Sequence, residues 1–189
     1  MPGALQWQFS GSATDFSRVS ETEYTGEAHL VQRSQGWMFG AFAGDDNFMH
    51  GNAWNVGVEG ALYFRRATLA ASLAYENDDD LDTEGEMLLT EARYFVSRNF
   101  RLDGIFDYAR TSSAGVDADG AIYGVGGEYR VPSTPFSVFA RYTHANITDV
   151  NTDIDTGLLG LRYNFDKDLA ARDEQGASLL SVPNLGSLF

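Results

Sequence analysis

The residues of this sequence that could do chemistry are clustered carboxylates, three histidines and a set of arginines that alternate with apolar positions. One cluster places oxygen-bearing side chains at alternate positions, as a calcium-binding loop does: Asp149, Asn151, Asp153 and Asp155. The cluster lacks the glycine at the sixth position and the bidentate glutamate at the twelfth position that complete such a loop. We expect a solvated acidic segment, with weak calcium binding as the alternative.

The three histidines, His29, His50 and His144, could act as general bases. His144 ends an apolar run shortly before Asp149, and His29 follows Glu27. None of the three stands at a recognisable spacing from a nucleophile. We therefore expect no enzyme activity and no cofactor.

The chain has 189 residues, with 27 acidic and 13 basic side chains and a formal net charge of -14. This charge argues against nucleic-acid binding, because phosphates are held by clustered Lys and Arg and Lys167 is the only lysine. The lack of cysteine excludes disulfides and thiolate metal sites. An apolar fraction of 43% predicts one folded domain. The start, Met-Pro-Gly-Ala-Leu, lacks a basic and apolar leader, so we expect any export signal to have been removed.

Apolar residues recur at every second position in ten runs, which is the period of β-strands and not of helices. No stretch is long and apolar enough for a membrane-spanning helix, and all four prolines fall outside the runs. The predicted strands are Leu5–Phe9, Tyr24–Arg33, Trp37–Ala43, Trp54–Phe64, Thr68–Tyr75, Leu88–Phe95, Phe100–Ala109, Ala121–Arg130, Phe136–His144 and Thr156–Phe165.

The connections between these runs alternate in length. Segments 12–23, 44–53, 76–87, 110–120 and 145–155 are long and acidic, whereas 34–36, 65–67, 96–99 and 131–135 are short. Consecutive antiparallel strands joined in this way place the long loops at one end and the short turns, with both termini, at the other. We therefore predict an all-β, up-and-down antiparallel sheet of ten strands, rather than eight, that closes into a barrel.

One face of each run is apolar, and its aromatic side chains concentrate at the strand ends. Tyr24, Trp54, Tyr75, Tyr108, Tyr123 and Tyr142 lie beside the long loops; Trp37, Phe64, Tyr94, Phe100, Tyr129, Phe136, Tyr163 and Phe165 lie beside the short turns. Two aromatic belts are expected at the two interfaces of a membrane, and a soluble interior gives no reason for them. We predict a transmembrane barrel with its apolar face outward, and a soluble lipocalin-like binding barrel is the alternative.

The other face of the runs carries balanced charges. Its acids are Glu27, Glu59, Glu91, Asp103, Asp107 and Glu128, and its bases are Arg33, Arg93, Arg101, Arg130, Arg141 and Arg162. An enclosed lumen requires such balance, because an unpaired buried charge is costly. Ten strands enclose little more than side chains, so we predict a lumen plugged by this charge network, with a narrow or gated water path as the alternative.

The last run, Gly160–Phe165, has a glycine followed by aromatic or apolar residues at alternate positions and ends in phenylalanine. With the ten runs, it resembles the small outer-membrane β-barrels of Gram-negative bacteria, the outer-membrane protein A and porin-like group, over residues 4–165. The resemblance implies location in the outer membrane, extracellular loops, contact with lipid and lipopolysaccharide, and recognition by the outer-membrane assembly machinery. The loop carboxylates could then bridge through divalent cations to lipopolysaccharide phosphates. The sequence departs from the pattern because Phe165 is not its last residue.

Residues 166–189 are predicted to form a periplasmic tail with a charged first half and an apolar second half. We expect a flexible terminus or a docking segment formed by Leu179, Leu180, Val182, Leu185, Leu188 and Phe189. A docking segment would bind a periplasmic or membrane protein partner, a neighbouring copy or the lower rim of the barrel. The expected function is that of a structural or interaction barrel, and the alternative is a small passive porin-like channel.

Overall fold

The structure is a computed structural model of the chain. It describes residues 3, 5–16, 21–48, 51–78, 82–113, 116–148, 152–163, 168–175 and 180. Among these residues, no helix is long and apolar enough to span a membrane.

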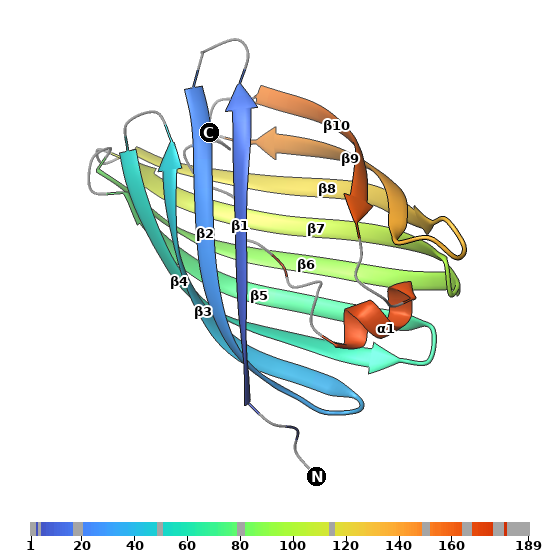
Figure 1. The fold of residues 1–189 in the computed structure, drawn as a ribbon. Helices are drawn as coiled ribbons and strands as arrows, with labels where there is room; N and C mark the ends of the chain where they lie inside the picture. Colours follow the sequence, from blue (N-terminus) through green and yellow to red (C-terminus); the bar gives the residue numbers. More distant parts are fainter. Residues whose placement is uncertain are drawn as a thin grey trace.

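Ten strands form one sheet in which each strand pairs with the next in antiparallel orientation. The strands are β1 Leu5–Phe16, β2 Glu21–Arg33, β3 Trp37–Phe48, β4 Gly51–Phe64, β5 Ala67–Asp78, β6 Thr83–Ser97, β7 Phe100–Ser113, β8 Val116–Arg130, β9 Phe136–Ile147 and β10 Thr152–Tyr163. The sheet curls, so that β1 and β2 lie in front of β5–β8 (Figure 1). The predicted up-and-down topology of ten strands is confirmed.

The strands are longer than predicted at the end where the long loops were expected. β3 continues to Phe48 and β6 begins at Thr83, so large parts of segments 44–53 and 76–87 are paired strand. The apolar alternation stops where the side chains become polar, but the backbone ladder continues beyond that point. Many of the acidic residues assigned to loops, such as Glu84 and Asp119, therefore project from strand extensions. Phe165 lies outside the described residues.

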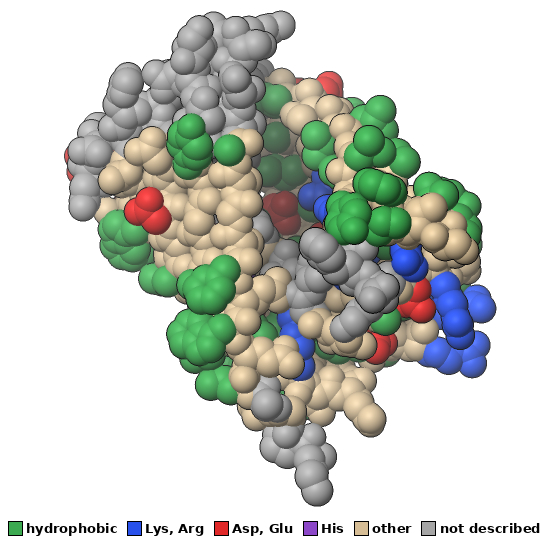
Figure 2. All heavy atoms as spheres, viewed as in Figure 1, with side chains coloured by type: hydrophobic (Ala, Val, Ile, Leu, Met, Phe, Trp, Pro, Cys, Tyr) green, Lys and Arg blue, Asp and Glu red, His purple; other side chains and the backbone are tan. Residues whose placement is uncertain are grey.

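The two faces of the sheet separate apolar from polar side chains. On β5, Leu69 and Leu73 are exposed, whereas Thr68, Ser72 and Glu76 are buried. Hydrophobic side chains gather on the outer surface, and acidic and basic side chains are visible in the hollow between its two flanks (Figure 2). An apolar exterior around a polar interior is the reverse of a soluble barrel, so the lipocalin-like alternative does not describe this fold.

Aromatic pairs mark both ends of the outer face. The rings of Trp54 and Tyr75 lie 5.7 Å apart beside the long-loop end, and those of Phe136 and Tyr163 lie 5.3 Å apart beside the short turns. These pairs lie where the two predicted aromatic belts place them. They are suited to the polar–apolar boundary on each side of a membrane.

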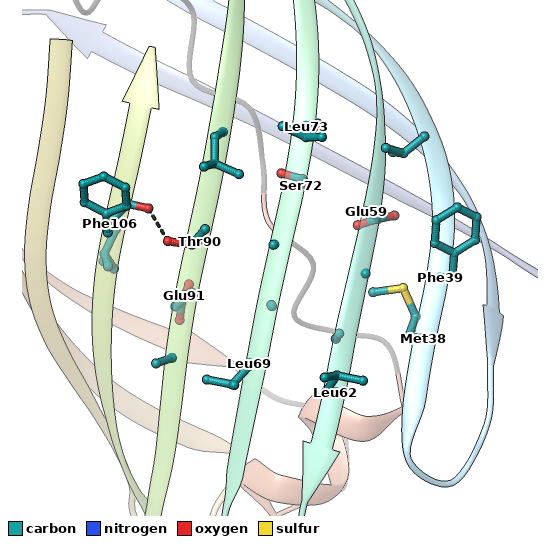
Figure 3. A pocket seen from close by; sticks show the side chains of 18 of the residues that line it. Met38, Phe39, Glu59, Leu62, Leu69, Ser72, Leu73, Thr90, Glu91 and Phe106 are labelled. Atoms are coloured by element: carbon teal, nitrogen blue, oxygen red, sulfur yellow. Dashed lines mark hydrogen bonds between the residues drawn. The ribbon is translucent and has the colours of Figure 1, made fainter.

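A shallow apolar depression of about 880 Å³ crosses the outer face of β3–β7. Phe39, Leu62, Leu69 and Phe106 surround it (Figure 3). Thr90, a polar residue on this apolar face, donates its hydroxyl hydrogen bond to the backbone carbonyl of Phe106. Its hydrogen-bonding requirement is thus met within the sheet, which makes a hydroxyl tolerable on a lipid-facing surface.

The two edge strands, β1 and β10, are not paired with each other in the described residues. The sheet is therefore a curved, open barrel, and the predicted closure between the first and last strands is not present in this part of the chain. The edges carry very exposed apolar side chains, with Phe9 at 75%, Leu159 at 76% and Leu161 at 77% exposure. Because lipid offers no hydrogen-bond partners, both edges must be paired when the protein is inserted in a bilayer.

A short helix, α1 Leu169–Glu174, lies in the segment predicted to be a flexible or docking tail. Asp168 caps its N-terminus by accepting a hydrogen bond from the backbone N–H of Ala171 at 2.8 Å. The backbone N–H of Leu169 donates to the carbonyl of Arg98, in the turn between β6 and β7, at 3.1 Å. α1 therefore lies at the short-turn end of the sheet (Figure 1), and Leu169 is completely buried.

Candidate functional site: the charged lumen and the α1 latch

The inner face of the sheet carries charges of opposite bias on its two halves. Among the side chains that the structure describes, the inward charged residues on β2–β5 are Glu27, Arg33, Asp46, Glu59, Glu76 and Asp78; on β6–β10 they are Glu91, Arg93, Arg101, Asp103, Asp107, Glu128, Arg130, Arg141 and Arg162. Five of these six arginines lie on β6–β10, so a mainly acidic wall faces an arginine-rich wall. This arrangement creates an electric field across the lumen.

His29 joins two of the predicted lumen acids on the acidic wall. Its Nδ1 atom lies 3.0 Å from Oε1 of Glu59, and its Nε2 atom lies 3.7 Å from Oε2 of Glu27. Ser10 on β1 also donates to Glu27, at 3.1 Å. Glu59 can reach β2 because Gly40 on the intervening strand has no side chain at this level.

Arg93 on β6 links the strand wall to α1. Its Nε atom donates to Oε1 of Glu91 at 2.9 Å, and its Nη1 atom donates to Oδ1 of Asp173 at 2.5 Å. The other carboxylate oxygen of Asp173 accepts a hydrogen bond from the hydroxyl of Thr68 on β5 at 2.6 Å. All four side chains are buried. The carboxylate of Asp173 is therefore held by groups from two adjacent strands.

Glu128 on β8 is the second link to α1. The two terminal nitrogens of Arg172 donate to its two carboxylate oxygens at 2.8 and 2.6 Å, in a bidentate arrangement. Arg162 on β10 donates to Oε2 at 2.7 Å, and the hydroxyl of Ser137 donates to Oε1. Arg101 lies 3.6 Å away. Glu128 is only 1% exposed, so it is a buried anion surrounded by cations.

We call this set of contacts the α1 latch: Arg172 and Asp173 on α1, with Thr68, Arg93, Glu128 and Ser137 on the strands. It adds one charge of each sign, so it leaves unchanged the excess of acids that the buried Asp46, Glu76 and Asp78 give to the predicted balanced set. Sequence patterns paired none of its members across the chain. The cue in the sequence was a run of good helix formers after Asp168, a residue type that caps helices.

The remaining predicted lumen charges have weaker or separate contacts. Arg101 pairs with Asp103 at 2.7 Å, and Arg141 lies 3.7 Å from Glu91. Asp107 accepts the backbone N–H of Thr90 at 2.9 Å. The buried Nε atom of Arg130 forms no hydrogen bond with any residue that the structure describes. The predicted residues therefore form separate clusters on the wall, and Glu91 and Glu128 link several of them.

One predicted docking residue of the tail is described. Leu180 packs against an inward apolar cluster formed by Phe42, Ala74, Met87, Leu89 and Ala109. The docking surface for this residue is thus the lumen of the barrel itself. The other predicted docking residues, Leu179, Val182, Leu185, Leu188 and Phe189, lie outside the described residues.

The predicted calcium cluster is only partly described, because Asp149 and Asn151 lie outside the described residues. Asp155 accepts hydrogen bonds from Tyr142 at 2.6 Å and from His144 at 2.9 Å, and Asp153 accepts one from Asn146 at 2.7 Å. Nowhere in the described part of the chain are three His, Cys, Asp or Glu side chains arranged to hold a metal ion. The carboxylates of Asp153 and Asp155 instead pair with side chains of β9.

A ten-stranded up-and-down sheet with an apolar exterior and a charged interior defines an outer-membrane β-barrel protein. A profile of one such family matches residues 8–172, and the chain belongs to this family, the Gram-negative porins. No curated protein sequence matches the chain. Membership of the Gram-negative porin family places the protein in the outer membrane, as predicted.

Solved structures of OmpT, an outer membrane protein of Vibrio cholerae, have a similar fold. A loop L8 deletion mutant is 17% identical, with a TM-score of 0.57 over 82% of this chain and 58% of that chain. The in-vitro folded trimer form is 14% identical, with a TM-score of 0.54 over 82% and 64%. OmpT expressed in the outer membrane is 17% identical, with a TM-score of 0.53 over 82% and 60%. The chain thus spans less than two thirds of these proteins.

Proposed function

We propose that this protein is a porin-family barrel whose lumen is held closed at the short-turn end by its own α1 segment. The observation that carries this proposal is the α1 latch, in which a helix that follows the last strand is bound by three buried wall side chains, Thr68, Arg93 and Glu128. In this resting form the protein acts as a structural and interaction barrel and not as an open pore.

The dimensions of the parts support closure. An α-helix with its side chains is about 10–12 Å across, and a barrel of about eight strands is already filled by its own side chains. A ten-stranded barrel is only slightly wider, so one that holds α1 at one end and Leu180 further inside retains little space for a water path. We therefore expect the lumen of the latched form to pass few ions.

The orientation that we propose follows from the charges and the termini. The acidic strand extensions and loops face the outside of the cell, and both termini face the periplasm. The partners are lipid, lipopolysaccharide and the outer-membrane assembly machinery, with no role for nucleic acid. We propose no enzyme activity, because His29 is buried between two glutamates and His144 is engaged by Asp155.

A small passive channel is the second candidate function, and membership of the porin family favours it. The two functions differ in whether the lumen conducts while α1 is latched. The arginine-rich wall opposite an acidic wall would suit either function. Conductance measurements decide between them.

We predict that the double variant Arg172→Ala/Asp173→Ala, the unlatched variant, conducts at least about tenfold more ions than the unaltered chain. Each substitution removes a charged hydrogen-bonding group, and such a group contributes about 1.5–3 kcal/mol. Together the two groups favour the latched position of α1 by well over tenfold, so their loss should release the helix from the lumen. Single-channel recordings in planar bilayers measure the effect. Stable openings of equal size in both proteins would support the passive channel and contradict closure by α1.

A matched control is the exposed pair Arg110–Asp119, which lies at the long-loop end with its atoms 3.6 Å apart. The double variant Arg110→Ala/Asp119→Ala also removes one arginine and one aspartate, so the net charge stays the same. We expect its conductance to equal that of the unaltered chain. An increase as large as that of the unlatched variant would mean that loss of charge, and not release of α1, opens the barrel.

A further inference from the structure

The wall groups of the α1 latch form two complementary charged subsites side by side. One subsite holds a guanidinium group and the other holds a carboxylate, and adjacent residues of α1, Arg172 and Asp173, fill both. We propose that this part of the wall is a binding site for small solutes that carry a guanidinium or ammonium group together with a carboxylate, and that α1 occupies it as a tethered ligand. The inference rests on the proposed function in one respect, namely that α1 can leave the lumen.

The cationic group is recognised by Glu128. Both of its oxygens face the two terminal nitrogens of Arg172, at 2.8 and 2.6 Å. Ser137 and Arg162 donate to the same carboxylate and fix its position. A fixed bidentate carboxylate matches the planar fork of a guanidinium group, and an ammonium group can form only part of this contact.

The anionic group is recognised by Arg93 and Thr68. Glu91 accepts from Nε of Arg93, which orients the guanidinium so that Nη1 points to the carboxylate of Asp173. Thr68 donates to the second oxygen at 2.6 Å. One charged and one neutral donor therefore reach the two oxygens of one carboxylate. Both wall side chains are at least nine-tenths buried, with Thr68 at 2% and Arg93 at 4% exposure.

The pairing of the subsites sets the class of ligand. Because Arg172 and Asp173 are neighbours in the chain, the subsites are spaced for two charges within one small molecule. The ligand contributes no net charge, so it leaves the charge balance of the lumen unchanged. When α1 leaves, Arg93 and Glu128 each lose a buried partner, and a solute with both charges replaces both partners at once. Arginine-like amino acids with a blocked α-amino group, and capped short peptides with one basic and one acidic side chain, have this chemistry.

Tethering explains why the site is occupied by α1 in the unaltered chain. A tethered group acts as if present at roughly millimolar concentration, so a free solute of similar intrinsic affinity competes only near or above that level. Removal of the two α1 side chains should therefore expose the site to free ligand without altering its wall. The unlatched variant is the appropriate protein for a binding test.

The test is calorimetric titration of the full-length unlatched variant, in detergent micelles, with the capped dipeptide N-acetyl-Arg-Asp-amide. We expect it to bind the variant at least about tenfold more tightly than it binds the unaltered chain. Capped Ala-Asp and Arg-Ala, which each lack one charge, should bind the variant at least about tenfold more weakly than Arg-Asp. Absence of binding, or equal binding of all three peptides, would overturn the proposal.

Two further measurements separate the possible reasons for failure. Far-ultraviolet circular dichroism and heat-dependent gel mobility report whether the unlatched variant is folded. The matched control for binding is Arg110→Ala/Asp119→Ala, which should bind Arg-Asp no better than the unaltered chain does. A variant that conducts but does not bind the peptide would retain the proposed function and overturn this inference. A variant that binds the peptide but does not conduct would support this inference and overturn the proposed function.

The anionic subsite has its own prediction within this test. Adding Thr68→Val to the unlatched variant removes one of the two carboxylate donors with little change in side-chain size. We expect weaker binding of Arg-Asp and unchanged binding of Arg-Ala, because Arg-Ala lacks the carboxylate that Thr68 contacts. Equal weakening of both peptides would indicate general damage to the wall and would count against the assignment of this subsite.

Discussion

Replacing Glu128 with glutamine is expected to lower the free energy of unfolding by about 3–5 kcal/mol, because removing one partner of a buried ion pair leaves the other uncompensated. Arg172 and Arg162 both donate to the Glu128 carboxylate, and the amide that replaces it is neutral. Urea unfolding in detergent micelles, followed by tryptophan fluorescence, measures the loss. The same variant should release α1 and increase conductance.

Two comparisons test the cause of this loss. Adding Arg172→Met to Glu128→Gln removes one of the stranded cations and should recover part of the stability. Arg110 forms an exposed ion pair with Asp119. The substitution Arg110→Ala should lower the free energy of unfolding by less than about 1 kcal/mol, because solvent screens that pair. If Glu128→Gln and Arg110→Ala had equal effects, Glu128 could not be the centre of the α1 latch.

Replacing Leu73 with arginine is expected to cost about 2–4 kcal/mol in a bilayer, the range for a lipid-facing arginine near the membrane centre. Leu73 lies in the middle of β5 on the outer face and is 58% exposed. Unfolding from lipid vesicles by denaturant gives the free energy directly. The effect should be much smaller in a loosely packed detergent micelle.

The matched control is Leu102→Arg, which makes the same exchange on the outer face close to the start of β7. At this depth an arginine reaches the interface, so the cost should be about 0–1 kcal/mol. Equal costs at Leu73 and Leu102 would contradict the placement of the lipid bilayer around this outer face.

The topology of the fold could be predicted because the signal is repeated along the whole chain. Alternation of apolar residues gave the ten strands, the alternating lengths of the connections gave the two ends, and the aromatic belts gave the outward face. The strand ends at the loop side could not be predicted, because polar residues such as Glu84 pair in the ladder without any apolar partner to reveal it. The open edge between β1 and β10 leaves no trace in a pattern that treats each strand alone.

The lumen charges could be predicted as a set, because each lies on the polar face of its strand. Their contacts could not, since these depend on the register between strands. His29 pairs with Glu59 across an intervening strand, and Thr68 binds Asp173, which comes 105 positions later in the chain. α1 was missed because a six-residue helix has too few turns to show a helical period. It is stabilised mainly by its contacts with the wall.

The order of contacts along the chain has a consequence for assembly. Every strand pairs with its neighbour in sequence, so the sheet can grow by short steps. The latch joins residues far apart in the chain, with a sequence separation of 105 for Thr68 and Asp173 and of 44 for Glu128 and Arg172. Contacts that close such long segments form late, because their loop entropy must be overcome before they contribute any stabilisation. We therefore expect α1 to dock only after β5, β6 and β8 are in place, so that a docked α1 indicates that this part of the wall is complete.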